Sequence, residues 1–490
     1  MIRFYYFLFE AFKLRFGTGA EAPCGSEALR MERREKALKD SKLLPDEKCA
    51  EAGACLREIL RGNRETRKGG TYAVCSAHVA VLEAAIEQAL EDGSLLHVES
   101  TSSQVNQFGG YSGSTPSQFA HFIRSAAENA GMERERILLG GDHLGPFPWR
   151  AEPSGSALAK ACELVRDCVR AGYQKIHLDA SMQCADDPAS GLPEKVVAQR
   201  AAMLCQAAEE ASQGLPPDSP RLMYVIGTEV PVPGGESVES HSPAVTTAEH
   251  ASRTLQTFRE AFAGASLSSA WERVIAVVVQ PGVDFGSNVI FAYDSAKAQS
   301  LSRALSNYPE IVFEAHSTDY QSPQALALMV RDHFAILKVG PWLTFAYREA
   351  VLALGRIERE LLGTSSGAQL SEVRQALEDA MLRDPSQWKA YYAGSEDEVR
   401  RDLIYAFSDR CRYFWHQPAV QTEISRLLRN LSAKPVPLSL ISQYLPPEYE
   451  AIRAGALQTL PGEMIRHHIR RVLRVYANAC STQPSVEPDS

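Results

Sequence analysis

Eight short apolar runs recur between residues 70 and 362, and a segment with helical spacing follows each of them. The runs are too apolar to leave one face of a sheet in water, as strands covered on both faces would be. They occupy residues 71–76, 95–101, 136–143, 175–181, 222–230, 273–280, 311–317 and 335–340. Eight strand–helix units predict a closed parallel (β/α)8 barrel, the TIM barrel. A doubly wound open sheet is the alternative, but no Gly-x-Gly-x-x-Gly turn follows the first strand.

The segments that flank this alternation have other patterns. Residues 1–69 carry charged runs broken by Gly and Pro, and they predict a helical or disordered N-terminal extension without much core of its own. Residues 363–480 contain amphipathic runs joined by proline-rich turns, which predict a helical C-terminal subdomain. Residues 481–490 are rich in Pro, Ser and acids and predict a disordered tail. The aromatic run at residues 1–16 is too short and too charged to span a bilayer.

The net charge of the chain limits the classes of molecule that it is expected to bind. A formal net charge of −9 provides no basic field for a phosphodiester backbone, so nucleic acid is excluded as an expected partner. Local basic groups can still hold one small anionic substrate. The 10 cysteines form no Cys-x-x-Cys pair, which indicates reduced thiols in a cytoplasmic protein. The sequence leaves the oligomeric state, including a homo-oligomer, open.

Polar side chains stand at the carboxyl ends of nearly all the predicted strands, where barrel enzymes build their active sites. The third strand ends in Asp142 and His143, just before Gly and Pro break it. In the fourth and seventh strands a His and an acid stand two residues apart, so both face one side of the strand. The other strand-end acids, imidazoles and cation on which the prediction rests are His177, Asp179, Glu229, Glu314, His316 and Lys338.

This convergence of acids and imidazoles predicts a metal site. Such groups are costly to desolvate together unless a cation or a substrate lies among them. Mixed His and carboxylate ligands suit Zn²⁺ or Mn²⁺, with Mg²⁺ an option if oxygens dominate. We predict His143, Glu229 and His316 as ligands, with His177 as the substitute. Asp142 would stay ionised beside a cation and could act as the base.

Further roles are assigned to other strand-end and loop residues. Glu314 and Asp179 join the predicted catalytic group. Ser317, Thr318 and Lys338 stand in the late-strand region, where barrels often hold a phosphate. Structural alternatives stay open, because a strand His is often bonded within the core, an Asp can cap a helix, and Lys338 can pair with a barrel acid. The predicted substrate-binding residues are Gln104, Asn106, Gln107, Ser317, Thr318 and Lys338.

Long strings of residues carry a resemblance to a known family. They span residues 103–111, 140–146, 175–182, 226–235, 314–321, 336–341 and 441–446. On these strings the chain, from about residue 75 to residue 480, resembles the Z-type subunit family of class II D-tagatose-1,6-bisphosphate aldolases. That family also contains tagatose 6-phosphate (fructose 6-phosphate) 4-epimerases.

The resemblance implies one of two functions: a non-catalytic partner that stabilises the aldolase subunit, or a metal-dependent epimerase. The order of Asp142-His143, Glu229 with its following Gly-Gly, and His316 is similar to the zinc site of the catalytic class II aldolases. At the strand where that pattern has a further zinc His, this chain has Gln280. The loss of one imidazole from a three-His site argues against aldolase activity.

The chemistry of the sugar connects the two implied functions. Carbon 4 of a ketohexose is two atoms from the carbonyl carbon, so simple enolisation cannot invert it. A nicotinamide route is not supported, because the chain has no dinucleotide fingerprint. Retro-aldol cleavage, rotation and re-addition need a metal for the enediolate and a base for the 4-hydroxyl proton. The sequence therefore predicts metal-dependent 4-epimerisation of tagatose 6-phosphate and fructose 6-phosphate, with the accessory subunit as the alternative.

Overall fold

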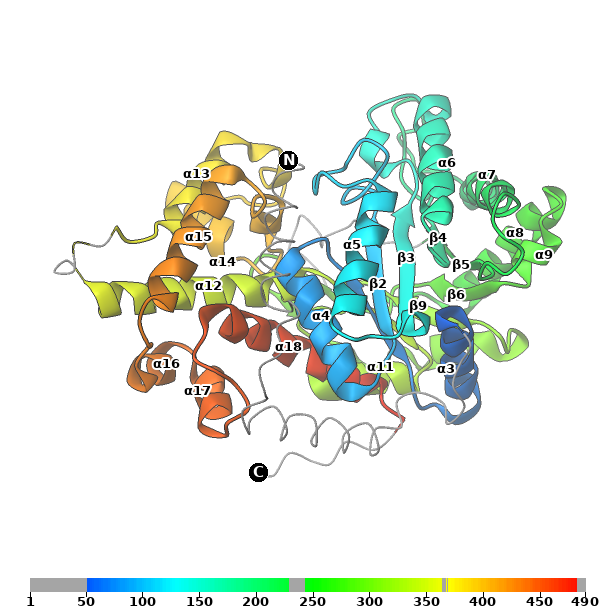
Figure 1. The fold of residues 1–490 in the computed structure, drawn as a ribbon. Coiled ribbons are helices and arrows are strands. Elements are labelled where there is room, and N and C mark those ends of the chain that lie inside the picture. The colour runs from blue at the N-terminus through cyan, green and yellow to red at the C-terminus, as the bar shows by residue number, and fades with distance from the viewer. Residues whose placement is uncertain (1–50, 229–242, 364–366, 368, 483–490) are drawn as a thin grey trace.

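Eight parallel strands form a closed barrel in the order β1-β10-β9-β6-β5-β4-β3-β2 (Figure 1). The structure is a computed structural model that describes residues 51–228, 243–363, 367 and 369–482. The barrel strands are β1 Thr71–Cys75, β2 Leu96–Thr101, β3 Ile137–Leu144, β4 Lys175–Leu178, β5 Met223–Gly227, β6 Val274–Val278, β9 Val312–Ala315 and β10 Ile336–Val339. The predicted TIM barrel is confirmed.

The strands are apolar because both of their faces are buried. The five residues of β6 are aliphatic and fully covered, as expected for a parallel strand between the barrel interior and an outer helix. In the register between β1 and β10, Thr71 pairs with Ile336 and Ala73 pairs with Lys338. Small or apolar neighbours of this kind leave room inside the barrel for the few long polar side chains. Any charge within a strand must therefore find its partner inside the barrel.

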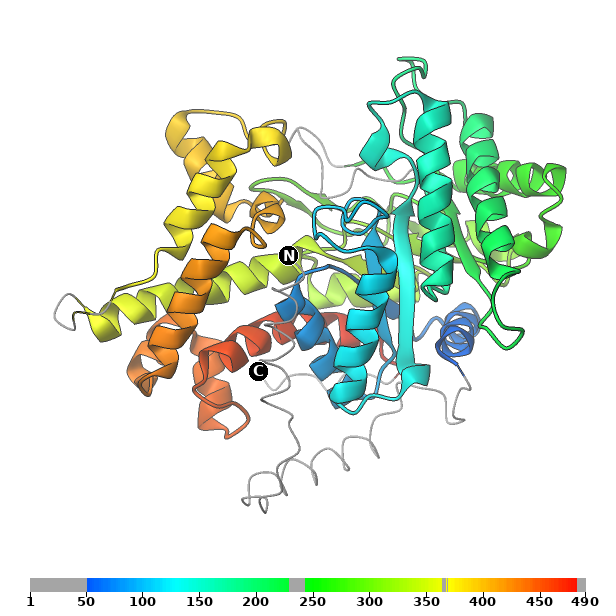
Figure 2. The ribbon, with the colours of Figure 1, turned by 45° about the horizontal axis from the view of Figure 1, so that its top comes forward.

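Helices surround the barrel on its outer side (Figures 1 and 2). Thr115 begins one of them with a capping box, in which its hydroxyl accepts from the Gln118 backbone N–H and the Gln118 side chain accepts in return. Thr247 begins another by accepting from the His250 N–H. These helices are α4 Val79–Asp92, α5 Pro116–Asn129, α6 Ser154–Arg170, α7 Glu194–Ser212, α8 Ala248–Gly264, α11 Pro323–Arg331 and α12 Pro341–Leu362, with short turns at α9 Ser268–Trp271 and α10 Gln299–Ser302.

Helix α3 (Ala52–Thr66) closes the amino end of the barrel. Its apolar residues recur at helical spacing and pack against the first residues of the strands. Asn63 fixes the helix by donating to the carbonyl oxygens of Gly69 and Val330. The sequence predicted little core for this segment, but its charges lie on the opposite face of an amphipathic helix. The buried cluster includes Ala52, Cys55, Leu56, Leu60, Leu138, Met223, Val312 and Ile336.

A two-stranded hairpin, β7 (Asp284–Phe285) with β8 (Ile290–Phe291), follows the carboxyl end of β6. The sequence did not predict it, because each strand has only two residues. The hairpin reaches the C-terminal part of the chain, where the Phe407 N–H donates to the Ser287 carbonyl oxygen. The barrel and the C-terminal helices therefore contact each other at the carboxyl end of the strands.

The C-terminal region is helical, as predicted, and its last helix returns to the barrel (Figure 2). Helix α18 packs against α4, α11 and α12, and the Tyr476 hydroxyl donates to the Thr318 carbonyl oxygen. The described part of the chain contains no helix that is long and apolar enough to cross a membrane. The boundaries at residues 69, 362 and 480 stay predictions. The helices are α13 Val373–Arg383, α14 Glu396–Tyr405, α15 Pro418–Ser432, α16 Leu438–Tyr444, α17 Pro446–Arg453 and α18 Pro461–Cys480.

Candidate active site

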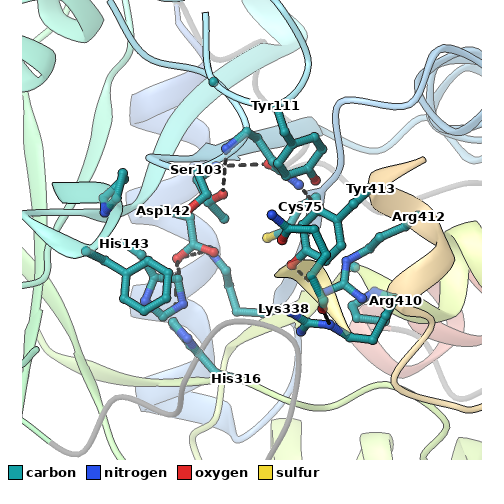
Figure 3. Close-up of a pocket in the computed structure, with 18 of the residues that line it drawn as sticks. Cys75, Ser103, Tyr111, Asp142, His143, His316, Lys338, Arg410, Arg412 and Tyr413 are labelled. Atoms are coloured by element: carbon teal, nitrogen blue, oxygen red, sulfur yellow. Dashed lines mark hydrogen bonds and ion pairs between the residues drawn. The ribbon is translucent and has the colours of Figure 1, made fainter. Parts of the chain in front are cut away.

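A cavity of about 620 Å³ lies between the carboxyl ends of the barrel strands and the C-terminal region (Figure 3). Asp142, His143 and Lys338 line it from the barrel side. Arg410 and Arg412, from the short helical turn η5 (Arg410–Tyr413), line it from the opposite side. The two sets of polar groups therefore share one cavity although they are far apart in the sequence.

Three imidazoles surround the Asp142 carboxylate. The Oδ1 atom of Asp142 lies 3.2 Å from His177 Nδ1, 3.9 Å from His143 Nε2 and 4.0 Å from His316 Nε2. The ring centroids of the three histidines are 4.8 to 5.2 Å apart. Burial alone would raise the pKa of Asp142, but His143 and Lys338 hold that pKa well below its usual range. Asp142 is therefore an ionised carboxylate among imidazoles.

An irregularity near the end of β3, between Gly141 and Leu144, sets the position of His143. This residue has a φ of +49°, a conformation that non-glycine residues adopt only where the surroundings enforce it. Its Nδ1 lies 2.8 Å from Asp179 Oδ2, and Asp179 Oδ1 accepts from the Ser181 hydroxyl. A Cβ at Gly145 would meet the Asp179 carbonyl oxygen at 1.6 Å, so only glycine lets the two strand ends pass. Asp179 is thus placed to orient the His143 ring.

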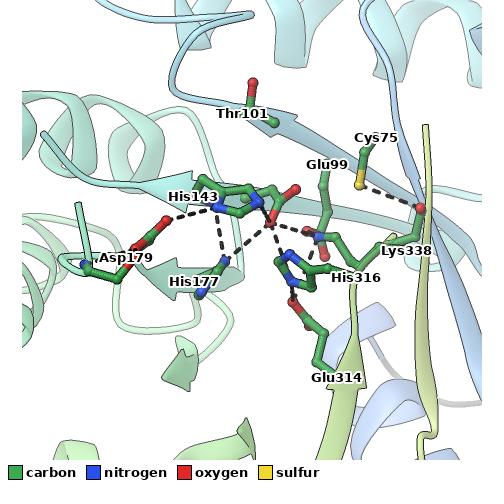
Figure 4. A network of polar contacts seen from close by, with 12 residues as sticks. Cys75, Glu99, Thr101, His143, His177, Asp179, Glu314, His316 and Lys338 are labelled. Atoms are coloured by element: carbon green, nitrogen blue, oxygen red, sulfur yellow. Dashed lines mark hydrogen bonds and ion pairs between the residues drawn. The ribbon is translucent and has the colours of Figure 1, made fainter. Parts of the chain in front are cut away.

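Glu314 in β9 and His316, the residue directly after β9, contact each other, as their two-residue spacing predicted (Figure 4). Glu314 Oε1 lies 2.9 Å from His316 Nε2. Burial lowers the pKa of His316 to about 4, although Glu314 and Asp142 oppose that shift. The His316 ring is therefore neutral at pH 7, which is the form of histidine that binds metals.

Two buried lysines neutralise the acids inside the barrel. Lys175 Nζ lies 2.6 Å from Glu99 Oε1 and 2.6 Å from Glu314 Oε2, and all three side chains are fully covered. Lys338 Nζ lies 3.0 Å from Asp142 Oδ1 and also contacts Glu99. The sequence predicts that a bound cation or substrate compensates the clustered acids. The two ammonium groups supply part of that positive charge. The open alternative of a Lys338 paired with barrel acids is the arrangement found.

Four groups of the site fit a divalent cation. Asp142, His177, Glu314 and His316 each offer one ligand atom, and these atoms all lie within 4.8 Å of one another. Among the described residues the buried Nε2 atom of His177 has no hydrogen-bond partner, a state that is costly unless another group binds it. Imidazole nitrogen and carboxylate oxygen are the donors that Zn²⁺ and Mn²⁺ accept. The donor set therefore supports a metal site.

The predicted ligands fall into three groups. His316 and the substitute His177 belong to the four-residue group. His143 stands beside it, with Nδ1 turned to Asp179 and Nε2 3.9 Å from Asp142. Glu229 lies outside the described residues.

The loop after β2 brings Gln104 and Asn106 to the cavity wall, but their amides also build the loop. Gln104 Oε1 accepts from the Thr101 N–H, and Gln104 Nε2 donates to the Cys75 carbonyl oxygen. Asn106 Oδ1 accepts from two backbone N–H groups of the same loop, and its Nδ2 donates to the Ser102 carbonyl oxygen. Substrate contact by these amides stays a prediction.

The other predicted substrate residues separate into two groups. Ser317 and Lys338 line the cavity. Thr318 does not, because its fully buried hydroxyl donates to the Lys338 carbonyl oxygen. Gln107 donates to the Lys160 carbonyl oxygen and is also absent from the cavity wall. The structure therefore places Gln107 and Thr318 in supporting positions.

Sequence reasoning missed two sets of residues. Glu99 and Lys175 were not chosen, although a charge inside an otherwise apolar strand signals a partner within the barrel. The sequence did not predict Arg410, Arg412 and Tyr413, because they lie in η5, far along the chain from every strand end. No local pattern separates these arginines from surface arginines, since only the packing of the C-terminal region brings them to the cavity.

Three solved structures are similar to this chain to different degrees. A protein described as a probable tagatose 6 phosphate kinase from Sinorhizobium meliloti 1021 has 40% identity over 84% of this chain and 100% of its own, with a TM-score of 0.76. Fructose-bisphosphate aldolase from Campylobacter jejuni has 11% identity over 78% of this chain and 92% of its own, with a TM-score of 0.40. The YdjI aldolase from Escherichia coli K12 has 11% identity over 77% and 98%, with a TM-score of 0.36.

One family model covers most of the sequence. It matches residues 56–481, from α3 at the amino end of the barrel to the end of α18. The match therefore spans the barrel, the candidate site and the C-terminal helices together. The chain belongs to the D-tagatose-1,6-bisphosphate aldolase subunit GatZ/KbaZ-like family.

Proposed function

We propose that this chain is a divalent-metal-dependent 4-epimerase of tagatose 6-phosphate and fructose 6-phosphate. The observation that supports it most is the buried group of Asp142, His177, Glu314 and His316, of which Asp142 and His316 line the cavity. Membership of a family linked to tagatose-bisphosphate aldolase fits a six-carbon keto-sugar phosphate as substrate. A chain that served only as a scaffold would gain nothing from so costly a group.

The proposed reaction breaks and re-forms the bond between carbons 3 and 4. Asp142 takes the proton of the 4-hydroxyl, and the electron pair of the broken bond passes to carbon 3. The three-carbon aldehyde turns over, the bond re-forms on its other face, and Asp142 returns the proton to the oxygen on carbon 4. When bound by His177, Glu314 and His316, a divalent cation supplies positive charge for the enediolate. Lys338 keeps Asp142 ionised before the first step, so that the carboxylate can accept the proton.

Turnover by the purified chain tests this proposal. Fructose 6-phosphate is incubated with the chain and Mn²⁺ or Zn²⁺, and tagatose 6-phosphate is measured by chromatography. We expect product with metal and none after chelation. The variant Asp142→Asn should lose at least a hundredfold in kcat, because general-base catalysis is typically worth ~10²–10⁴. A chain that gives no product with any divalent metal contradicts the proposal. Unphosphorylated fructose shows whether the phosphate is required.

The alternative function, a non-catalytic subunit of a class II aldolase, is favoured by the description of the family as an aldolase subunit. It predicts tight binding to an aldolase catalytic subunit and an increase in that subunit's activity or stability. Asp142→Asn should preserve both effects if the site has no catalytic role. An Asp142→Asn chain that still activates the aldolase, together with no epimerase turnover by the unaltered chain, would favour this alternative.

A further inference from the structure

The cavity wall opposite the barrel strands carries a buried guanidinium with an unused donor. Arg410 is 4% exposed and lines the cavity from η5 (Figure 3). Its Nε donates to the Gln387 carbonyl oxygen at 2.6 Å, whereas its buried Nη1 has no hydrogen-bond partner within the described part of the chain. A buried N–H of a charged group is rarely left unpaired unless another molecule accepts from it. Arg410 therefore lines the cavity and has one guanidinium nitrogen without a hydrogen-bond partner among the described residues.

Arg412 adds a second positive charge to the same wall. Its Nη1 donates to the carbonyl oxygens of Ser408 and Asp409, and its Nη2 donates to the Tyr413 hydroxyl. Among the described residues, no carboxylate forms an ion pair with Arg410 or Arg412. The neighbouring Asp409 carboxylate is used by Arg348, at 2.8 Å. Two adjacent guanidinium groups thus line the cavity, and in the described part of the chain neither has a carboxylate within ion-pair distance.

Aromatic rings hold these guanidinium groups in place. The Cζ atom of Arg410 lies 3.7 Å from the centroid of the Tyr391 ring and 4.9 Å from that of Tyr413. The Cζ atom of Arg412 lies 4.4 Å from the Tyr413 ring centroid. A guanidinium that is stacked on a ring keeps its N–H edge free for hydrogen bonds in the plane of the group. This geometry suits the oxygens of a phosphate, which arginine binds through paired N–H groups.

Lys338, the lysine that lines the cavity, is less suited than the two arginines to bind a phosphate group. Lys338 Nζ contacts Asp142 and Glu99 and lies 3.8 Å from Glu314 Oε1. These carboxylates neutralise the ammonium group and would repel a dianion. The late-strand phosphate position predicted from the sequence therefore fits less well than the wall that carries the two arginines.

We propose that Arg410 and Arg412 bind the phosphate group of the sugar substrate, while the barrel residues hold its carbon chain. This inference rests on the proposed function for the identity of the sugar. The substrate is then a phosphate monoester, and the C-terminal region forms part of the substrate site.

Binding measurements with matched variants test the proposal. Isothermal titration calorimetry with fructose 6-phosphate compares the unaltered chain with Arg410→Gln and Arg412→Gln. The control is Arg453→Gln, because Arg453 also stacks on a tyrosine, Tyr449, but lies outside the cavity. We expect each cavity variant to lose at least tenfold in affinity and the control to lose less than twofold. Cavity variants that fold and bind with unaltered affinity would overturn the proposal.

A second measurement needs no substitution. Phenylglyoxal modifies arginine side chains, and mass spectrometry locates the modified residues. Fructose 6-phosphate should protect Arg410 and Arg412 from modification while Arg453 remains reactive, and inorganic phosphate should protect them at higher concentration. Protection by fructose 6-phosphate alone would still support the site and would show that the sugar contributes to binding. Equal modification with and without fructose 6-phosphate contradicts the proposal.

The two proposals fail in different ways. If the chain binds fructose 6-phosphate through Arg410 and Arg412 but does not epimerise it, the phosphate-site proposal stands and the proposed function is wrong. A chain that epimerises fructose 6-phosphate with an unchanged KM in both arginine variants retains the function and loses the phosphate site. A chain that binds no fructose 6-phosphate overturns the phosphate site.

Discussion

At the scale of single residues, the barrel interior is organised by a buried layer of charge. Glu99, Lys175 and Glu314 are fully covered, and Lys338 and Asp142 lie above them toward the cavity. Each ion is compensated by its neighbours, so the cost of removing it from water is partly recovered within the network. The carboxyl end of the barrel, with the candidate site, therefore lies above an ionic layer.

Removal of Lys175 should leave the free-energy cost of burying two carboxylates uncompensated. Lys175→Met leaves the Glu99 and Glu314 carboxylates buried without their shared cation, and we expect a loss of ~3–5 kcal/mol in the free energy of unfolding. Urea denaturation monitored by circular dichroism measures it. Lys160→Met is the control, because the pair of Lys160 with Glu152 is 36% and 37% exposed and should be worth less than ~1 kcal/mol. Equal losses in both variants would contradict a stabilising role for the ionic layer.

Substitution of His316 should remove bound metal. His316→Gln deletes one imidazole donor while it keeps a polar side chain, and we expect affinity for Zn²⁺ or Mn²⁺ to fall at least tenfold, the scale at which even supporting groups of a metal site act. Inductively coupled plasma mass spectrometry of the dialysed protein measures the metal content. His121→Gln, on the exposed surface of α5, is the control. Full metal content in His316→Gln would exclude His316 as a ligand.

At the scale of elements, α3 completes the barrel core from outside the eight strand–helix units. Leu56 is fully buried against the amino ends of the strands. Leu56→Ala should therefore cost ~2–5 kcal/mol in the free energy of unfolding, through lost burial and the cavity that remains. Leu382→Ala on α13 is the control, because Leu382 is 41% exposed. A loss of less than ~0.5 kcal/mol for Leu56→Ala would show that α3 is a dispensable appendage.

The contact between α17 and α18 should make stability depend on pH. His468 Nδ1 lies 3.2 Å from Glu448 Oε1, and His468 Nε2 lies 3.4 Å from Glu349 Oε2. Burial opposes protonation, but the two acids raise the pKa of His468 to about 9. The folded state therefore holds this proton more tightly than the unfolded chain, where the pKa is about 6.5.

The sign of this effect follows from the raised pKa. The contribution of His468, on the order of 3 kcal/mol, is fully present below pH ~6.5 and is lost as the pH rises through 9. Denaturation of the unaltered chain and of His468→Gln at pH values from 6 to 10 measures it. The difference in unfolding free energy between the two should shrink as the pH rises. A difference that stays constant over this range would contradict the assignment.

At the scale of the whole molecule, the cavity exists only because the C-terminal region packs over the carboxyl end of the barrel (Figures 2 and 3). A buried ion pair of Arg348 with Asp409 joins α12 to the residue just before η5. The same Asp409 accepts from the Thr344 hydroxyl at 2.7 Å. This junction fixes the arginines that face the strand ends.

Neutralising Asp409 should therefore affect both stability and substrate binding. Asp409 has a φ of +46°, which asparagine also tolerates, so Asp409→Asn keeps the backbone and removes the charge. We expect a loss of ~3–5 kcal/mol in the free energy of unfolding and a higher KM for fructose 6-phosphate, with unchanged metal content. Asp167→Asn, in an exposed pair with Arg170, is the control. An unchanged KM would show that the junction does not position η5.

The strand ends were predictable from the sequence because a strand places alternate residues on one face. Glu314 and His316 contact each other as their spacing required, and Asp142 and His143 reach the same site. The partner of each group was not predictable. Lys175 meets Glu99 across 76 residues and Lys338 meets Glu99 across 239, and these distances along the chain leave no local signal.

Taken alone, the amino-acid sequence determined the strand–helix alternation, the barrel, the helical C-terminal region and the family, because hydrophobic periodicity and long shared strings are local properties. The tertiary structure alone decided that α3 closes the amino end of the barrel, that two lysines neutralise the acids, and that Arg410 and Arg412 complete the cavity. Those features depend on which buried charges and apolar faces meet when distant segments pack. The packing of these segments decides how deeply each charged group is buried. That burial in turn sets the pKa and the reactivity of the group.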